Sequence, residues 1–563
     1  MPTRTTPAPE YWPLFIPKTV IVLREGYDLR KFMADSLAGL IVAIVALPLS
    51  MALAIASGVT PDRGIYTAIV AGFLISALGG SRFQIGGPTG AFVVVVFNVI
   101  QAHGYDGLAI ATLMAGILLI FAGFAKLGTF VKYVPHPVVT GFTSGIAVII
   151  FSSQVAEVLG LHLGENPAGF VEKWIAYARA IGTAEPATFA VAMMSLAVIL
   201  GCRLWRPQWP MFLIAIALGA VAAVVLHLPV VTIGTRFGSL PSMLPEPHLP
   251  HVTLARIREL LPSAFTIAFL AGVESLLSAV VADGMTGRHH RSNCELVAQG
   301  VANIGSIIFG GIPATGAIAR TATSIRAGAY SPVAGMMHAV FLLLFMAVLA
   351  PLAAYIPLSS LGAVLIVVAW NMAEIQNFRH LMKAPAADRA VLLTTFVLTL
   401  ITDLTTAIEI GVLMAALFFM HRMADAVEIS TDAKVIEEDL DDLSRQREAY
   451  ERREGIPDDV EVFRINGPFF FGAAARLRDV LQHLRTPPSA FILRMGNVPM
   501  IDASGAAVLE KFIDDAARRG TRTILSNVQP DVLAAIKSLG LTAKPSVIIA
   551  KNLQKALAAA AAK

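Results

Sequence analysis

The sequence predicts an all-α membrane domain of about fourteen spans, followed by a small soluble α/β domain. Of its 563 residues, 56% are hydrophobic and only 15% are charged. A soluble globular chain of this length does not require so much apolar surface. Long uncharged stretches recur before His421, and beyond it charged residues become frequent while strand and helix patterns alternate. The chain is therefore expected to span the lipid bilayer and to end in an aqueous domain.

The spans are predicted from runs without Asp, Glu, Lys or Arg. About 20 consecutive apolar residues suffice to cross a bilayer as a helix. The longest run has room for two spans separated near Pro357. With the shorter apolar segments between them, these runs give about fourteen spans. The uncharged runs are residues 36–61, 83–105, 133–156, 207–235, 296–319 and 327–373.

Charge bias in the connections predicts the orientation. Cytoplasmic loops of membrane proteins carry an excess of Lys and Arg. Every second connection is basic, while the opposite ones are mixed or acidic, so both termini are expected in the cytoplasm, with the chain in the cell inner membrane. The basic connections hold Arg82, Lys126, Lys132, Arg203, Arg206, Arg288, Arg291, Arg379, Lys383 and Arg389, and the opposite ones hold Asp106, Glu157, Glu165 and Glu172.

Four regions follow from composition. They are a cytoplasmic N-terminal segment (1–30), a membrane domain (31–424), a charged linker (425–458) and a soluble domain (459–560). In the last region strand patterns alternate with helix patterns, which predicts a sheet covered by helices. The net charge of +4 is too small to indicate a nucleic-acid partner.

An internal repeat is visible at an offset of 226 residues. Leu47–Gly58 matches Val273–Gly284 in its small and apolar positions, and the same offset carries Thr89-Gly90-Ala91 onto Thr315-Gly316-Ala317. Agreement of two separate stretches on one offset indicates a duplication of about seven spans. Because seven is odd, the second copy enters the membrane from the other side, so the repeat is inverted.

Helix breakers stand at corresponding places in both copies, in GGPTGAF (86–92) and GGIPATGAIAR (310–320). In an inverted repeat, helices that start near mid-membrane point their N-termini toward each other. Unpaired N–H groups and positive dipole ends then converge, which favours an anion. Gly90 and Gly316 would let the ligand approach the backbone, and Thr89 and Thr315 would offer hydroxyls. The alternative is that these kinks only allow close helix packing.

One acid lies within an apolar helix. Glu274 has no basic residue within a turn, and its repeat counterpart is Pro48. Intramembrane acids usually mark ion pathways, so we expect a proton or cation coupling site. The alternative is a structural pair with Arg320. If the pair does not form, Arg320 is expected either to anchor its helix or to supply positive potential. Ser278, one helical turn after Glu274, is either a ligand of a sodium ion or a polar contact between packed helices.

Several long motifs resemble the SulP family of anion transporters. They are Gly39–Tyr66, Gly86–Phe92, Val273–Gly287 and Gly310–Thr323, and the tail, with IDASG at Ile501–Gly505, resembles the cytoplasmic STAS domain of that family. The resemblance covers residues 30–560. It implies two inverted seven-span repeats, a core that moves against a gate, and a homodimer that carries sulfate, bicarbonate, chloride or dicarboxylates.

Carried over by position, the resemblance places the anion at the starts of spans 3 and 10. Where sodium–bicarbonate members have Asp, Thr and Thr, this chain has Glu274, Ser278 and Ile318, which favours the pattern of proton-coupled sulfate carriers. The serine phosphorylated in stand-alone STAS proteins is replaced by Ala503, so that switch is not expected. The anion positions are Thr89, Gly90, Ala91, Phe92, Thr315, Gly316, Ala317 and Ile318.

The leading hypothesis is a proton-coupled sulfate transporter. A sodium-coupled bicarbonate symporter and a dicarboxylate carrier come next, followed by an anion channel, a voltage-driven motor and a membrane sensor. Glu274 argues against a passive channel, which needs no coupling carboxylate. No nucleophile–base constellation or phosphate loop is visible, so no enzyme, cofactor or metal site is expected.

Overall fold

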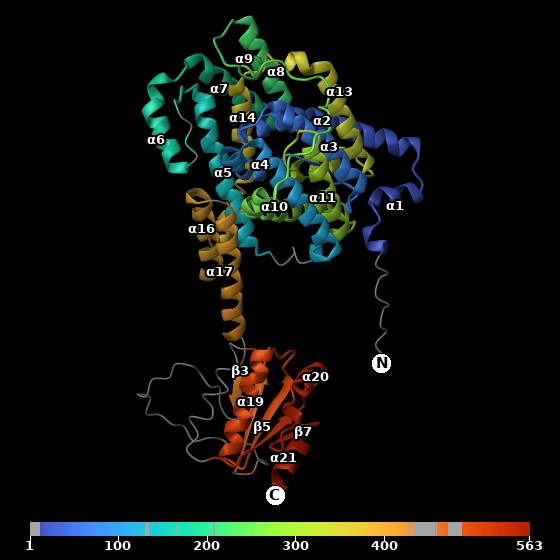
Figure 1. Cartoon of the computed structure of the whole chain (residues 1–563), viewed down its shortest axis with the longest axis vertical. Coiled ribbons are helices and arrows are strands. Elements are labelled where there is room, and N and C mark those ends of the chain that lie inside the picture. Colours follow the sequence, from blue (N-terminus) through green and yellow to red (C-terminus); the bar gives the residue numbers. More distant parts are fainter. Residues whose placement is uncertain are drawn as a thin grey trace. The chain divides into compact units, whose positions relative to one another are not determined.

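The structure is a computed structural model (Figure 1) that describes residues 12–129, 134–164, 167, 169–206, 209–402, 404–425, 428–431, 457, 459–470 and 487–562. Most of the predicted linker, the helix predicted from the sequence pattern at residues 474–484, Lys132 and Glu165 lie outside the described residues. Contacts divide the chain into two units, Met1–Val412 and Leu413–Lys563, which are described separately.

The first half of the membrane unit begins with a short helix that precedes the spans. α2 contains Pro48, and α4 breaks at Gly104, whose φ of 69° is outside the helical region. The elements are α1 (Lys18–Arg24), α2 (Leu29–Ala56), α3 (Pro61–Leu78), β1 (Gly86–Gly87), α4 (Gly90–Phe124), α5 (His136–Leu159), α6 (Phe170–Ala180), α7 (Pro186–Trp205), α8 (Met211–Val225) and α9 (Ile233–Phe237).

The second half repeats this order from a long helix onward. The predicted separation near Pro357 is confirmed, since Pro357 caps the start of α14. The elements are α10 (Leu254–Thr286), α11 (Ser292–Ile308), β2 (Thr315–Gly316), α12 (Ile318–Arg326), α13 (Val333–Ala353), α14 (Leu358–Met372), α15 (Ile375–Leu381), α16 (Ala386–Ile401) and α17 (Leu404–Asp425).

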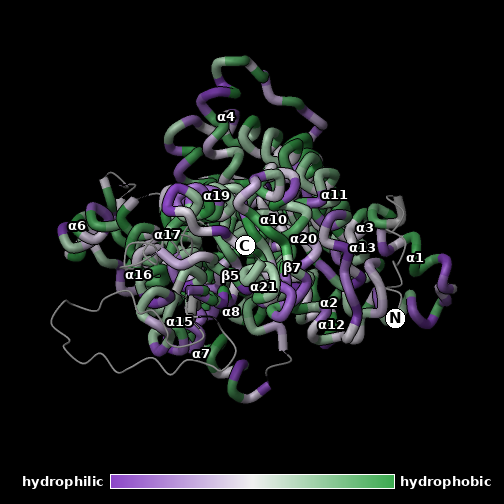
Figure 2. The backbone as a smooth tube through the Cα atoms, turned by 90° about the horizontal axis from the view of Figure 1, so that it is seen from below, coloured by the Kyte–Doolittle hydropathy of each residue, from purple (hydrophilic) through white to green (hydrophobic). Residues whose placement is uncertain are grey.

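Eight described helices are long and apolar enough to cross a membrane: α2, α4, α5, α7, α10, α13, α14 extended by α15, and α17. Figure 2 shows many hydrophobic stretches along the backbone tube. If α4 is counted on both sides of Gly104 and the shorter α3, α8, α11, α12 and α16 are included, the described part of the chain holds fourteen segments. Seven precede α9 and seven follow it, as a duplication requires.

The inverted relation of the two halves appears in their two short strands. β1 and β2 pair antiparallel, with Gly86 opposite Gly316 and Gly87 opposite Thr315. The helices that follow begin at Gly90 and Ile318, which are 228 residues apart rather than the 226 that aligned the sequence motifs. The duplication therefore holds, but its two helix starts are displaced by two residues relative to the Thr-Gly-Ala motifs.

The membrane helices sort into two bundles by their packing partners. In the core bundle, α4 packs on α10 and α11, and α13 packs on α2 and α3. In the gate bundle, α5 packs on α14 and α16, and α7 packs on α8 and α14, while α6 lies against α5 (Figure 1). Smaller contacts of α2 and α4 with α5, α8 and α14 join the two bundles.

The C-terminal unit is a mixed five-stranded sheet in the order β3-β4-β5-β6-β7, in which only β3 is antiparallel. Phe491 and Leu493 of β5 pack on Leu509 and Phe512 of α19. Ile492, on the other face of β5, packs in a second core that contains α21. The elements are β3 (Glu428–Thr431), β4 (Val460–Asn466), β5 (Ala490–Asn497), α19 (Ala503–Arg518), β6 (Arg522–Ser526), α20 (Pro530–Ser538), β7 (Val547–Ala550) and α21 (Leu553–Ala561).

The predicted helix-covered sheet is confirmed, and the sheet is larger than the sequence patterns indicated. β7 and α21 follow the last predicted helix. β3 falls within the segment assigned to the linker, yet it pairs with β4 and therefore belongs to the sheet.

Candidate functional site

The two helix starts meet at the β1–β2 strand pair. Thr89 is the N-cap residue of α4 and Ala317 is that of α12, and neither side chain caps its own helix. The first N–H groups of a helix have no intrahelical partner and carry its positive dipole end. Because the paired strands lead directly into these helices, both helix starts lie beside the same strand pair.

The side chains at these starts differ in exposure. Thr89 is half-buried, while Ala91, Phe92 and Thr315 are almost fully buried. The Thr315 hydroxyl donates to the carbonyl of Ala271 at 2.9 Å, so it is used within the core bundle. Ile318, the first residue of α12, is 41% exposed. Of the two predicted threonines, Thr89 is the one whose hydroxyl stands at a helix start.

The two predicted glycines face different neighbours. A Cβ on Gly90 would lie 2.3 Å from Met372 Sδ and 3.4 Å from Ile150, both in the gate bundle. A Cβ on Gly316 would lie 1.9 Å from Gln84 Nε2, inside the core bundle. Gly90 therefore marks the boundary between the bundles, whereas Gly316 is a packing position. Sequence reasoning missed Met372, because a methionine at the end of a span carries no distinguishing signal.

Glu274 is joined to the start of α4. This half-buried residue of α10 accepts a hydrogen bond from Thr89 Oγ1 at 2.8 Å. The alternative pairing with Arg320 is not formed: among the described residues no ion pair connects the two side chains. Ser278, one turn further on, is buried and donates to Thr321 Oγ1 at 3.2 Å.

Arg320 supplies a positive charge behind the strand pair. Its Nη2 donates to Ser50 Oγ at 3.1 Å and to the carbonyl of Pro88 at 3.2 Å. Within the described residues its Nε and Nη1 atoms have no hydrogen-bond partner, although the side chain is almost fully buried. A Cβ on Gly87 would lie 2.2 Å from Nη1, so the guanidinium lies directly against β1. The space around the helix starts is therefore favourable for negative charge.

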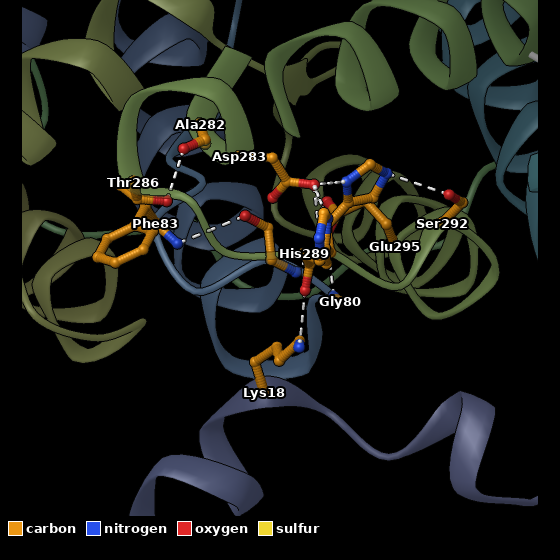
Figure 3. Close-up of polar contacts among 11 residues, drawn as sticks. Lys18, Gly80, Phe83, Ala282, Asp283, Thr286, His289, Ser292 and Glu295 are labelled. Atoms are coloured by element: carbon orange, nitrogen blue, oxygen red, sulfur yellow. Dashed lines mark hydrogen bonds and ion pairs between the residues drawn. The ribbon is translucent and has the colours of Figure 1, made fainter. Parts of the chain in front are cut away.

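Figure 3 shows a polar cluster near the junction of α10 and α11 that accounts for the other acids there. Glu295 accepts from the backbone N–H groups of Gly80 and Ser81 at 2.9 and 3.2 Å. Asp283 Oδ2 lies 2.7 Å from His290 Nδ1. The Glu295 contacts hold the loop that leads into β1, and the Asp283–His290 contact ties α10 to the connection before α11. The described residues contain no group of three or more His, Cys, Asp or Glu that could hold a metal ion.

A cavity of about 1080 Å³ approaches the start of α4 along one side of the first α4 segment. Its walls come from both bundles and from α6. Toward Gly90 the α4 side is lined by Val93 and Val94, one turn beyond that glycine. Other lining residues used below are Arg63, Phe97, Tyr105, Glu157, Glu172, Lys173 and Arg236.

Comparisons with known proteins agree with this architecture. The sulfate permease family matches residues 32–395, and the STAS domain matches residues 451–556. A putative sulfate transporter of Bacillus subtilis, YvdB, is 41% identical over 92% of this chain and 95% of its own length. The bicarbonate transporter BicA of Picosynechococcus is 29% identical over 86% of this chain and 87% of its own length.

Solved structures show the same fold. The murine anion transporter Slc26a9, in its inward-facing state, matches with a TM-score of 0.86 at 17% identity, over 100% of this chain and 97% of that one. The transmembrane domain of a cyanobacterial BicA matches with a TM-score of 0.62 at 28% identity, over 69% of this chain and 98% of that one. The paired half-helices, the two bundles and the C-terminal sheet are thus those of a known transporter class, and the chain belongs to the sulfate permease family of anion transporters, with a C-terminal STAS domain.

Proposed function

We propose that the protein imports sulfate together with protons, and that it holds the anion between the N-termini of α4 and α12. The hydrogen bond from Thr89 Oγ1 to Glu274 Oε2 carries this proposal, because it links a protonatable group to the residue that starts α4. A relative that is 41% identical is named as a putative sulfate transporter, which supports sulfate as the first substrate to test.

The coupling mechanism follows from the donor and acceptor roles of these two groups. An ionised carboxylate only accepts, so it holds the single hydroxyl proton of Thr89. A protonated Glu274 can itself donate to Thr89 Oγ1, which releases the threonine proton toward the helix start. A hydroxyl aimed at the anion strengthens its binding, and by reciprocity the bound anion favours protonation of Glu274. Proton and anion therefore bind together and leave together.

Neighbouring charges leave this pair free to act. Glu295 of α11 is held by two backbone N–H groups, and Arg320 of α12 is directed to Ser50 and Pro88. On α4, His103 pairs with Glu259 at 3.2 Å, at the far end of α10. None of these groups forms a described contact with Glu274, whose hydrogen-bond partner in the described part of the chain is Thr89.

Uptake of labelled sulfate into proteoliposomes under an imposed pH gradient tests the proposal. Glu274→Gln should abolish proton-driven accumulation and retain sulfate exchange. Thr89→Val should lose the pH dependence of sulfate binding, whereas Thr89→Ser, which keeps the hydroxyl, should retain it. A parent protein that accumulates sulfate equally well without a proton gradient contradicts proton coupling. A Thr89→Val variant with unchanged pH dependence contradicts the relay alone.

Sodium-coupled bicarbonate uptake is the second candidate, because two cyanobacterial bicarbonate transporters are each 29% identical to this chain. It requires Glu274 and Ser278 to hold the cation. The Ser278 hydroxyl is directed to Thr321, which favours the proton. Sodium gradients and labelled bicarbonate in the same liposomes separate the two candidates. In either case we place both termini in the cytoplasm of an inner-membrane protein, as the basic connections indicate.

A further inference from the structure

A buried lysine lines the cavity beside α4. Lys173 belongs to α6 and is only 6% exposed, and its Nζ lies 4.9 Å from the centre of the Phe97 ring. No carboxylate within the described residues forms an ion pair with it. Burial lowers the pKa of this ammonium below its ordinary value. A desolvated cation without a counter-ion gains free energy when an anion approaches it.

The other cations that line this cavity already have partners, with His162 lying 3.8 Å from a carboxylate oxygen of Glu185. Arg236 pairs with Glu157. Arg63 donates to the carbonyl of Gly310 at 2.9 Å and stacks on the Tyr105 ring at 3.5 Å. Glu172, next to Lys173 in sequence, is exposed and forms no ion pair with it. Lys173 is therefore the lining cation that has neither an anionic nor a carbonyl partner in the described part of the chain.

The position of Phe97 connects this lysine to the helix start. Residues at i, i+3, i+4 and i+7 share one face of a helix. Gly90, Val93, Val94 and Phe97 have this spacing, and the last three line the cavity. Seven residues of α-helix correspond to about 10 Å along the axis. The cavity wall thus runs from Lys173, over Phe97, to the valines one turn from Gly90.

The dipole of the first α4 segment explains why a cation is needed there. Its N-terminus attracts anions, but its C-terminal end, at the Gly104 break, carries partial negative charge and repels them. An anion that approaches from this end meets the unfavourable end first. The ammonium over Phe97 and the guanidinium over Tyr105 both lie beside this end and offset its field.

We propose that the Lys173 ammonium is a docking point for small inorganic anions in this cavity, occupied before the anion reaches the start of α4. The site takes sulfate, bicarbonate or chloride by charge and has few directional donors, so it binds weakly and releases quickly. In the orientation proposed above, the cavity lies on the outer side of the membrane. The role of Lys173 rests on anion transport by the family and is independent of the coupling ion.

Sulfate exchange at equal pH on both sides of proteoliposomes tests this site without involving proton coupling. Lys173→Gln should raise the KM for sulfate about fivefold to tenfold, with little change in the maximal rate, because a cation in a cleft raises the local anion concentration. Lys173→Arg should stay within about twofold of the parent, as the same principle requires. Lys383→Gln, which removes the same charge from an exposed connection, should leave KM unchanged. Equal KM values for Lys173→Gln and Lys383→Gln would overturn the proposal.

A chemical rescue separates loss of charge from loss of folding. Lys173→Cys should show the raised KM, and an aminoethyl thiosulfonate reagent, which restores an ammonium, should lower it again. A sulfonatoethyl reagent, which adds a negative charge, should raise it further. The parent, with its own Cys202 and Cys294, is treated identically as the control. If both reagents change KM in the same direction, bulk rather than charge is responsible and the docking role is wrong.

Discussion

The substitution of alanine for the two motif glycines should have opposite consequences for stability and transport. The Cβ of Gly316→Ala would lie 1.9 Å from Gln84 Nε2 and 2.6 Å from its Cδ. Gln84 is buried and donates to Ser275 Oγ at 2.6 Å, so it cannot move aside without breaking that bond. Overpacking costs about 1–3 kcal/mol, and leaving a buried donor unpaired costs about 1–3 kcal/mol more. We expect Gly316→Ala to destabilise the membrane domain by about 2–6 kcal/mol.

Gly90→Ala meets a different obstacle. Its Cβ would approach Met372 Sδ, the flexible end of a side chain in the gate bundle, which can change rotamer at little cost. Stability should therefore change little, whereas the contact between core and gate should weaken and the transport rate should fall. Thermal unfolding of both purified variants in one detergent, with sulfate exchange measured in parallel, makes the comparison. A Gly316→Ala protein as stable as Gly90→Ala would refute the reasoning.

Two further substitutions test polar contacts that stabilise each domain from within. Glu295→Gln should destabilise the membrane domain by about 2–4 kcal/mol. One carboxylate oxygen accepts from Gly80 and Ser81 and the other from Ser275 and Gln299, so the NH₂ group of a glutamine would face hydrogen-bond donors in either orientation. Thermal unfolding measures the loss against the exposed Glu246→Gln control, and equal midpoints for the two variants would contradict this prediction. Asp502→Ala should lower the free energy of unfolding of the C-terminal domain by about 1 kcal/mol, because Asp502 Oδ1 accepts from the Gly505 N–H at the start of α19. Urea unfolding measures this difference, with Ser504→Ala, which leaves the cap intact, as the control.

Hydropathy and breaker residues predicted most of the membrane fold, because span length and backbone satisfaction impose strong constraints in a bilayer. The separation at Pro357 and the duplicated order of helices were both visible in the sequence. The amphipathic α6 was not predicted, since eleven residues of mixed polarity resemble an ordinary loop. β3 was also missed, because four residues beside a charged segment give no periodic signal, and only pairing with β4 makes them a strand.

The candidate site was predicted in outline and not in detail. Thr-Gly-Ala motifs at one offset indicated two helix starts, but not that Thr315 would lie in a strand while Thr89 occupies the N-cap position of α4. Whether the threonine hydroxyl stands at the helix start depends on a two-residue displacement between the copies, which the alignment of the two motifs does not show. Met372 and Lys173 carry no motif, and their roles follow from tertiary contacts with Gly90 and Phe97. Such contacts between distant segments are beyond what spacing and composition encode.

The polar contacts at the helix starts join residues of one copy to residues of the other, so the site requires both copies. Glu274 belongs to the second copy, yet its hydrogen-bond donor, Thr89, belongs to the first. Arg320, also of the second copy, donates to Ser50 and Pro88 of the first. Neither charged residue has a charged counterpart at the repeat offset of 226 residues, where Pro48 and Val94 stand instead. The fold is therefore symmetric, but the charge is supplied by one copy and the groups that it contacts by the other. Two identical copies of one repeat would present either two acids or none at the helix starts. Two repeats that differ in sequence and belong to one chain can place a single acid beside a single hydroxyl.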